Sequence, residues 1–428
     1  MVQIGFLIYL FSQTFFLLNI QFPRSYNFDE FHYIPAAKQF LEHKLNKNWE
    51  HPPLGKLILA AGISIGGDRP IGWRCMSTFF GALTLVGLYA LSLVLFRDLK
   101  TALWITFLTL FNQLLYVQAR IGMLDTFMFA FLVWAMAAFC ATWDPRNNCN
   151  QNRRLFLLTG ILLGLSAACK WFALVPWISF CLLISLVRLL QGWQTQFKQP
   201  LKNDWYHPNL WKGISWTDWL FTLVGVPIFF YSLTYIPYFF IPEEDFSIYK
   251  IFTSQPRMWQ GQLHVVTTHP YMSQWTDWAI LKRPIWYAFE HEGAQNRWVR
   301  GVLLLGNPLI MWSGLLAVLV CAWEWIQRRD KTAFFIFYFY SIYYFSWAII
   351  PRKILFYYYY YPAGMVLSLA CAYVFHHPAY QKLLRTESTR WIFLGASILL
   401  FVYFSPILAA LKIPSNSFPT WMWFPSWI

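Results

Sequence analysis

Charged residues are scarce in this chain: they make up 12% of its 428 residues, about half the share of a soluble domain. Apolar residues reach 58% and aromatic residues 21%. A soluble globule of this size cannot bury so much apolar surface, and a disordered chain is polar and poor in aromatic residues. The composition therefore excludes both classes and indicates a membrane protein with many transmembrane helices.

Metal-site spacing and secretion signals are also missing. The seven cysteines are scattered, without the paired spacing of zinc ligands, and most lie in apolar runs where a small buried thiol is expected. The first apolar run, Ile4 to Phe22, has neither a charged N-terminal region nor a small-residue cleavage site. We therefore interpret this run as a retained span rather than a removed signal peptide.

Apolar runs of about the length needed to cross a bilayer predict eleven spans in one integral membrane domain over residues 1–428. The run at 102–118 is short, and the fifth and sixth runs are separated by little more than Lys170, so nine or ten spans are the alternative. The runs lie at about 4–22, 71–96, 102–118, 123–141, 155–169, 171–190, 218–238, 299–322, 333–349, 355–375 and 391–411.

The basic residues predict the orientation. With a cytoplasmic N-terminus, the cytoplasmic loops hold 15 Lys and Arg residues, whereas the short links on the opposite side hold only four. This bias predicts an internal N-terminus and an external C-terminus. The net charge of +14 then reflects topology and contact with anionic lipid, and not nucleic-acid binding.

Two long segments, about 23–70 and 239–298, fall on the predicted external side. Neither contains cysteine, so no disulfide is expected in them. The first is predicted to contain an amphipathic helix around Ile34 to Leu45, and both are expected to lie on the membrane surface. Together they are predicted to form the active-site face.

Two adjacent carboxylates, Asp29 and Glu30, directly follow the first span. Carboxylates at a membrane boundary are costly unless they serve a purpose. One interpretation is a general base that projects into an external cavity. The alternative is a helix N-terminal turn, with Asp29 as the cap and Glu30 facing the helix dipole.

The segment His51-Pro52-Pro53-Leu54-Gly55-Lys56 is the second candidate. Its prolines favour an extended backbone, and Gly55 permits close approach, so His51 and Lys56 could face one ligand. The alternative is a rigid turn before a membrane-entering helix. A metal site at Glu50 and His51 is disfavoured because no further ligands follow at a recognisable spacing.

Several cations and aromatic residues on the same predicted face could bind a lipid-linked substrate. Arg120 could pair with Asp125 or bind a phosphate oxygen, and the tyrosine run 357–361 could be an aromatic belt. Trp286 and Tyr287 could stack on a sugar, although interfacial aromatic residues are the commoner explanation. The candidate phosphate ligands are His51, Lys56, Arg120, Lys170, Arg283, Arg352 and Lys353.

A carboxylate base beside a cationic patch with lipid access suits one reaction. A hydroxyl is deprotonated and attacks a sugar whose leaving group is a lipid phosphate. The phosphate leaves as a stable anion, so cations can stabilise it and no general acid is needed. Glycoside hydrolysis differs, because a second carboxyl must protonate the leaving oxygen.

The motifs, taken in order, resemble the protein O-mannosyltransferase family over about residues 25–365. They are Phe28-Asp29-Glu30, His51-Pro52-Pro53-Leu54-Gly55-Lys56, Arg120 with Leu124-Asp125, Cys169-Lys170-Trp171, His269-Pro270-Tyr271, Arg283-Pro284-Ile285-Trp286-Tyr287, Gly306-Asn307-Pro308 and Pro351-Arg352-Lys353. The resemblance implies the C-type fold of membrane glycosyltransferases. It also implies a polyprenyl-phosphate sugar donor, in this family mannose, and a Ser or Thr hydroxyl acceptor on a translocated protein.

The resemblance further implies roles for single residues. Asp29 becomes the base, Glu30 assists in positioning, and the cations hold the donor phosphate. The reaction inverts the anomeric centre and needs no metal or other cofactor, and the enzyme can work as a dimer. The second long segment has no room for the β-trefoil domain of eukaryotic members, which indicates a short bacterial member in the cytoplasmic membrane with an external active site.

That missing domain leaves the acceptor open. One alternative keeps the fold and donor but transfers the sugar to a lipid or a cell-envelope glycan, as in aminoarabinose transfer to lipid A. Another is a transporter of a charged lipid, which would form no covalent product.

Overall fold

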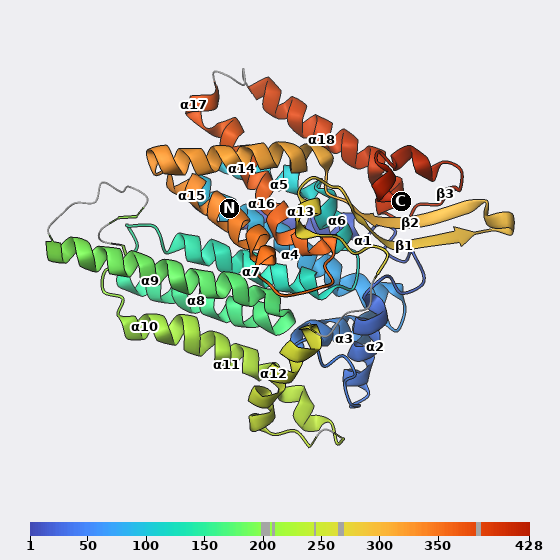
Figure 1. The fold of residues 1–428 in the computed structure, drawn as a ribbon, viewed down its shortest axis with the longest axis horizontal. Helices are drawn as coiled ribbons and strands as arrows, with labels where there is room; N and C mark the ends of the chain where they lie inside the picture. The colour runs from blue at the N-terminus through green and yellow to red at the C-terminus, as the bar shows by residue number, and fades with distance from the viewer. Residues whose placement is uncertain (198–205, 208–209, 244, 264–268, 382–386) are drawn as a thin grey trace.

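The computed structural model describes residues 1–197, 206–207, 210–243, 245–263, 269–381 and 387–428. Helices dominate this part of the chain, as the composition predicts (Figure 1). The helices before residue 200 are α1 (Val2–Leu17), α2 (Glu30–Leu41), α3 (Leu54–Gly66), α4 (Pro70–Phe96), α5 (Leu99–Leu110), α6 (Gln113–Gln118), α7 (Leu124–Ala141), α8 (Cys149–Cys169) and α9 (Leu174–Phe197). Those after it are α10 (Trp216–Leu220), α11 (Val226–Leu233), α12 (Ile248–Leu263), α13 (Trp275–Trp278), α14 (Pro308–Arg328), α15 (Lys331–Phe345), α16 (Tyr361–His376), α17 (Pro378–Gln381) and α18 (Glu387–Leu408).

Each of the eleven predicted apolar runs contains helix. Six helical stretches among the described residues are long and apolar enough to cross a membrane by themselves, and the count of eleven spans stays a prediction. The short run at 102–118 is two helices, because Asn112 ends α5 and caps α6 by accepting a hydrogen bond from the Leu114 N–H at 3.2 Å. The run at 218–238 is α10 and α11 joined by a π-helical turn, Phe221–Gly225.

The run predicted at 299–322 begins with a strand, which is a correction. Strands β1 (Ile285–Glu292) and β2 (Trp298–Leu304) form an antiparallel hairpin, and β3 (Ile413–Pro414) pairs with the outer end of β2. Helix α14 starts only at Pro308, because Asn307 caps it by accepting from the Leu309 N–H. The second half of β2 is continuously apolar and buried, so by composition alone it resembles the start of the following helix.

Loops predicted to be cytoplasmic meet at one end of the bundle. Arg97 and Asp144 form an ion pair at 3.2 Å, and Arg153 pairs with Asp218 at 3.1 Å. Because Asp144 and Arg153 lie in the same loop, these contacts join three predicted cytoplasmic loops, so the alternation of the predicted topology is consistent with the fold. Which end faces the cytoplasm stays a prediction from the charge bias.

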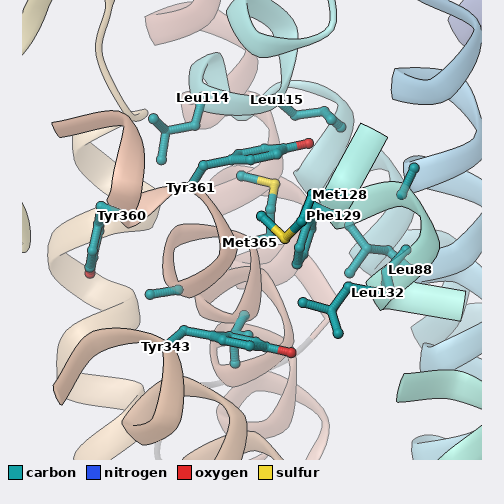
Figure 2. Packing of buried hydrophobic residues seen from close by; sticks show 14 of the residues in the cluster. Leu88, Leu114, Leu115, Met128, Phe129, Leu132, Tyr343, Tyr360, Tyr361 and Met365 are labelled. Atoms are coloured by element: carbon teal, nitrogen blue, oxygen red, sulfur yellow. The ribbon is translucent and has the colours of Figure 1, made fainter. Parts of the chain in front are cut away.

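The tyrosine run lies in the core, so its interpretation as an aromatic belt is wrong. All five rings are buried, in the 3₁₀ turn Tyr357–Tyr360 and the first residue of α16. Figure 2 shows Tyr361 among the apolar side chains of α6, α7 and α16, whereas Tyr360 points to the other side. The Tyr361 ring lies 5.0 Å from that of Phe129, and the Tyr360 hydroxyl lies 3.0 Å from that of Tyr340.

The first long segment packs against the α12 part of the second in one corner of the molecule, where Figure 1 places α2, α3 and α12. The helix predicted around 34–45 is α2, which starts and ends about four residues earlier. Phe40 of α2, Tyr238 and Ile251 of α12 form a small separate core. Gly55 permits close packing of α3 on α7, because a Cβ there would lie 2.7 Å from Leu124.

The last turn of the described chain is pinned under the hairpin. The Trp427 indole is buried and donates to the Leu281 carbonyl at 2.7 Å, while its own carbonyl accepts from the Trp286 indole at 2.8 Å. This exchange anchors the segment that leads into β1.

We expect Trp427→Ala to lower the free energy of unfolding by about 3–5 kcal/mol, because it empties a packed site and orphans the Leu281 carbonyl. Unfolding in detergent, followed by intrinsic fluorescence, measures the change. Trp391→Ala is the control, since that side chain is 65% exposed, and equal effects of the two variants would contradict the anchor.

Candidate active site

Five segments that are distant in sequence enclose a cavity of about 680 Å³. Its rim is open beside Phe31, whose side chain is 60% exposed. Every lining residue comes from a segment that the charge bias predicts to be external or from a helix end beside one. The lining comprises Phe28, Asp29, Phe31, His32, Tyr33, Asn48, Glu50, His51, Lys170, Gln262, His269, Arg352, Ile354, Phe356, Tyr358 and Tyr359.

Asp29 occupies the N-cap position of α2, but among the described contacts its carboxylate does not cap the helix. It lines the cavity, where Oδ2 accepts from the Tyr33 hydroxyl at 3.2 Å and lies 3.5 Å from the Tyr358 hydroxyl. Burial raises the pKa of Asp29, and this effect exceeds the opposing influence of the Lys170 charge. A carboxylate with a raised pKa is better suited to accept a proton.

Glu30 does not reach the cavity, which corrects its assignment to substrate positioning. It is fully buried, and Arg74 grips it with two hydrogen bonds of 2.9 Å. Its oxygens also accept from the backbone N–H groups of Asn27 and Gly122 at 2.8 Å each. Because four donors bind this carboxylate, it anchors the surrounding chain and does not take part in the reaction.

Arg120 is also committed to structure. Its guanidinium donates to the Phe16 carbonyl at 2.7 Å and to the Leu18 carbonyl, and it lies 4.7 Å from the Tyr116 ring centroid. The predicted alternative, an ion pair with Asp125, is wrong too, because Asp125 pairs with Lys170 at 2.7 Å.

Lys170 and Arg352 are the two predicted phosphate ligands whose charges the fold brings to the cavity wall. The Lys170 ammonium and the Arg352 guanidinium lie over the ring of Tyr359, at 5.1 and 5.2 Å from its centroid. Tyr359 in turn stacks on Trp347 at 4.4 Å, and Trp347 stacks on Phe172 at 4.9 Å. This aromatic stack holds two cations side by side at a membrane boundary.

His51 lines the cavity as predicted, whereas Lys56 does not. Burial, reinforced by the nearby Lys170, lowers the pKa of His51 well below its usual value and favours the neutral ring. Lys56 is fully buried and donates to the carbonyls of Asn48 and His51, the latter at 2.8 Å. These hydrogen bonds hold the loop that carries His51, so Lys56 acts as a positioning residue rather than a phosphate ligand.

The remaining predicted residues lie outside the cavity lining. Arg283 donates to the Pro270 carbonyl at 2.6 Å, and Lys353 is exposed at the protein surface. Trp286 is buried against the C-terminal turn, which rules out stacking on a sugar. Tyr287 is buried behind Phe28, with ring centroids 5.4 Å apart, and so supports the wall instead of facing substrate.

Sequence reasoning overlooked several lining residues. Tyr33 could have been found, because it follows Asp29 by four positions and so lies above it on the same helix face. Tyr358 and Tyr359 belong to the tyrosine run that the sequence suggested as an aromatic belt, and Gln262 carried no signal of its own. Only the fold brings these three residues to the cavity. Within the described chain, no group of three or more His, Cys, Asp and Glu residues could hold a metal ion.

A second, apolar cavity of about 340 Å³ adjoins the first. The two share His51, Lys170, Gln262, Arg352 and Tyr359, along with Glu50, so these residues stand at their junction. The apolar lining comes mainly from Trp171, Phe172, Leu174, Val175, Ile178, Trp259, Leu263, Trp347 and Ile350. Ile178 and Trp259 are 58% and 47% exposed, so the cavity opens to the protein surface.

Two family profiles match most of the chain. Residues 67–241 match the family described as dolichyl-phosphate-mannose-protein mannosyltransferase, and residues 247–427 match the C-terminal four-transmembrane region of protein O-mannosyltransferase. A polyprenol-phosphate-mannose–protein mannosyltransferase from Corynebacterium glutamicum is 26% identical over 94% of this chain and 88% of its own length. The Mycobacterium tuberculosis protein of the same name is 25% identical over 94% and 86%.

Solved structures confirm the fold class. The Saccharomyces cerevisiae protein O-mannosyltransferase Pmt1-Pmt2 complex bound to the sugar donor contains a chain that superposes with a TM-score of 0.78. The match covers 99% of this chain and 92% of that one at 16% identity. ArnT from Cupriavidus metallidurans in the apo state superposes with a TM-score of 0.56, over 96% and 77% at 12% identity.

We expect substitutions of the two adjacent carboxylates, Asp29 and Glu30, to have different effects on the free energy of unfolding. Glu30→Gln leaves Arg74 buried without its counter-charge, so we expect a loss of about 3–5 kcal/mol in the free energy of unfolding. Asp29→Asn removes a desolvated charge with only two long hydrogen bonds, so its stability should equal or exceed that of the parent. Unfolding of both variants in the same detergent tests the assignment, and the reverse order would refute it.

Proposed function

The chain belongs to the protein O-mannosyltransferase family, and from this premise we propose that it moves mannose from a polyprenyl-phosphate carrier to a Ser or Thr hydroxyl of a protein. It is a multi-pass membrane enzyme of the lipid-phosphate-dependent glycosyltransferase class. One observation carries the assignment. A cavity lined by Asp29, whose pKa is raised, and by the cations Lys170 and Arg352 adjoins a second, apolar cavity.

The donor fits the two cavities in one orientation. The prenyl chain occupies the apolar cavity, which is open to the exterior beside Ile178. The phosphate lies at the junction, where Lys170 and Arg352 supply positive charge. The sugar then extends into the larger cavity toward Asp29, and the acceptor enters through the rim beside Phe31.

The chemistry follows from this placement. Asp29 accepts the proton of the acceptor hydroxyl as the oxygen attacks the anomeric carbon from the face opposite the phosphate. The bond between that carbon and the phosphate oxygen breaks, and the configuration inverts. The two cations stabilise the charge that builds up on the phosphate, so we expect transfer without a divalent cation.

The finer features of the assignment rest on the relatives and on the charge bias. We place the enzyme in a bacterial cytoplasmic membrane with the cavity on the external face, where a translocated protein arrives. Assembly as a dimer stays a prediction. A lipid or envelope glycan is the competing acceptor, because the open rim does not select among hydroxyl compounds.

A transfer assay tests the function. Purified protein is given polyprenyl-phosphate mannose with a labelled sugar and a Ser/Thr-rich peptide, with and without chelator. We expect labelled peptide in both tubes, and at least a 10³-fold lower rate with Asp29→Asn, because the general base is lost. Glu42→Gln, an exposed carboxylate on the same segment, is the control and should keep the parental rate.

Each other result has a defined meaning. Donor consumption with label on a lipid or glycan would replace the protein acceptor and keep the fold and base. Loss of activity with chelator would overturn the metal-independent reaction. Parental turnover by Asp29→Asn would remove Asp29 as the base, and label moved across vesicles without a new covalent product would favour a transporter.

The pKa of Asp29 predicts the pH dependence. Asp29 acts only when ionised, and burial raises its pKa, with Asp125 adding to the rise and Lys170, His32 and the Tyr33 hydroxyl opposing it. Activity should therefore rise with pH through the raised pKa, above the usual value of about 3.9 for an aspartate. A profile of kcat/KM against pH measures this limb, and a limb at the ordinary value would contradict the desolvated site.

A further inference from the structure

We propose that Tyr33 and His51 form a relay that carries the proton accepted by Asp29 to the carrier phosphate as it leaves. The inference rests on the function proposed above. It gives His51 a catalytic task in place of the phosphate-binding one that the sequence predicts, and it assigns a task to Tyr33, which the sequence did not single out.

The Tyr33 hydroxyl lies between the carboxylate and the imidazole. It is 3.2 Å from Asp29 Oδ2 and 3.4 Å from His51 Nε2. Its ring is buried and meets the His51 ring edge-on, with centroids 5.6 Å apart. The hydroxyl has one proton for these two acceptors, so it can donate to either.

Gln262 fixes which imidazole nitrogen accepts. Its Oε1 accepts from Arg352 Nη1 at 2.8 Å, and its Nε2 donates to the Glu50 carbonyl at 2.9 Å, so the amide has one orientation. The same Nε2 lies 3.4 Å from His51 Nε2. Because Gln262 presents a donor there, His51 Nε2 must carry the lone pair and Nδ1 the hydrogen.

The electrostatics keep His51 neutral, so that Nε2 retains its lone pair. Burial and the charges of Lys170, Lys56, Arg352 and His32 all lower the pKa of His51. A neutral His51 can accept a proton, and these same cations favour its rapid loss to an anion. The departing phosphate is the anion that arrives at the junction, where His51 also lies.

The relay balances atoms and charge. The acceptor O–H bond breaks, its proton joins Asp29, and the acceptor oxygen bonds to the anomeric carbon. Protonated Asp29 then gives a proton to the Tyr33 oxygen while the Tyr33 hydrogen moves to His51 Nε2. The carrier phosphate leaves with the electron pair of the broken bond as a dianion and takes the proton from His51, since its second pKa is about 6.

Tyr358 is the control residue that distinguishes a proton relay from a hydroxyl that only donates a hydrogen bond to Asp29. Its hydroxyl faces the same Asp29 oxygen at 3.5 Å and is equally buried. Its other described hydroxyl contact is with Tyr359 at 3.1 Å, not with His51. Loss of this hydroxyl therefore removes a donor to Asp29 and leaves the route to His51 intact.

The experiment is a double-mutant cycle on kcat in the peptide-transfer assay, with the parent's activity established first. Tyr33→Phe and His51→Gln should each lower kcat about 10²-fold, the scale of one proton-transfer catalyst, with little change in KM for the donor. The double variant should fall no further than the worse single variant, because both interrupt one route. Tyr358→Phe combined with His51→Gln should instead multiply the separate effects.

Chemical rescue gives a second readout, because added imidazole restores the proton acceptor without restoring the side chain. His51→Ala should regain kcat on addition of imidazole, and the rescue should grow with the fraction of neutral imidazole. Multiplying effects of Tyr33→Phe and His51→Gln, or a His51→Ala variant that imidazole does not rescue, would overturn the relay. An inactive parent would instead refute the proposed function, so the two failures are distinguishable.

Discussion

The buried ion pair between Glu30 and Arg74 is the contact on which the site depends. Arg74 also donates to the carbonyls of Ile20, Pro23 and Ser25, so one side chain of α4 binds most of the connection between α1 and α2. Breaking such a pair leaves a buried charge without compensation, which costs several kcal/mol. The connection is therefore rigid, and Asp29, one residue before Glu30, has a fixed direction into the cavity.

The cations near the site fall into two groups, according to the partners that they bind and where the fold places them. Arg120 and Lys56 donate to backbone carbonyls near the helix ends, and Arg74 donates both to such carbonyls and to Glu30. Lys170 and Arg352 instead lie over Tyr359 at the cavity wall, where Lys170 also pairs with Asp125 and Arg352 also donates to Gln262. The same residue types thus build the site or serve it, according to whether the fold places them behind the cavity or on its wall.

The site lies where an apolar cavity and a polar cavity meet. An apolar cavity that reaches the exterior joins a polar cavity with an open rim, and the cations stand where the two meet. That arrangement suits a substrate with an apolar tail, an anionic head and a sugar. It also explains the raised pKa of Asp29, since the walls that admit a lipid-linked donor also remove water from the carboxylate.

The sequence by itself determined the membrane class, the positions of most helices and the order of the motifs, because these depend on composition and on apolar runs read along the chain. It also identified Asp29, His51, Lys170 and Arg352, which the fold brings together. The family resemblance made Asp29 the base, but the sequence could not show that Glu30 is a buried anchor, or separate Arg352 from Arg120, because those roles depend on partners distant in sequence. Tertiary structure decided them. Arg74 and the Gly122 N–H bind Glu30, and carbonyl oxygens bind Arg120, away from the cavity lining. The fold instead places Asp29, Lys170 and Arg352 on the cavity wall.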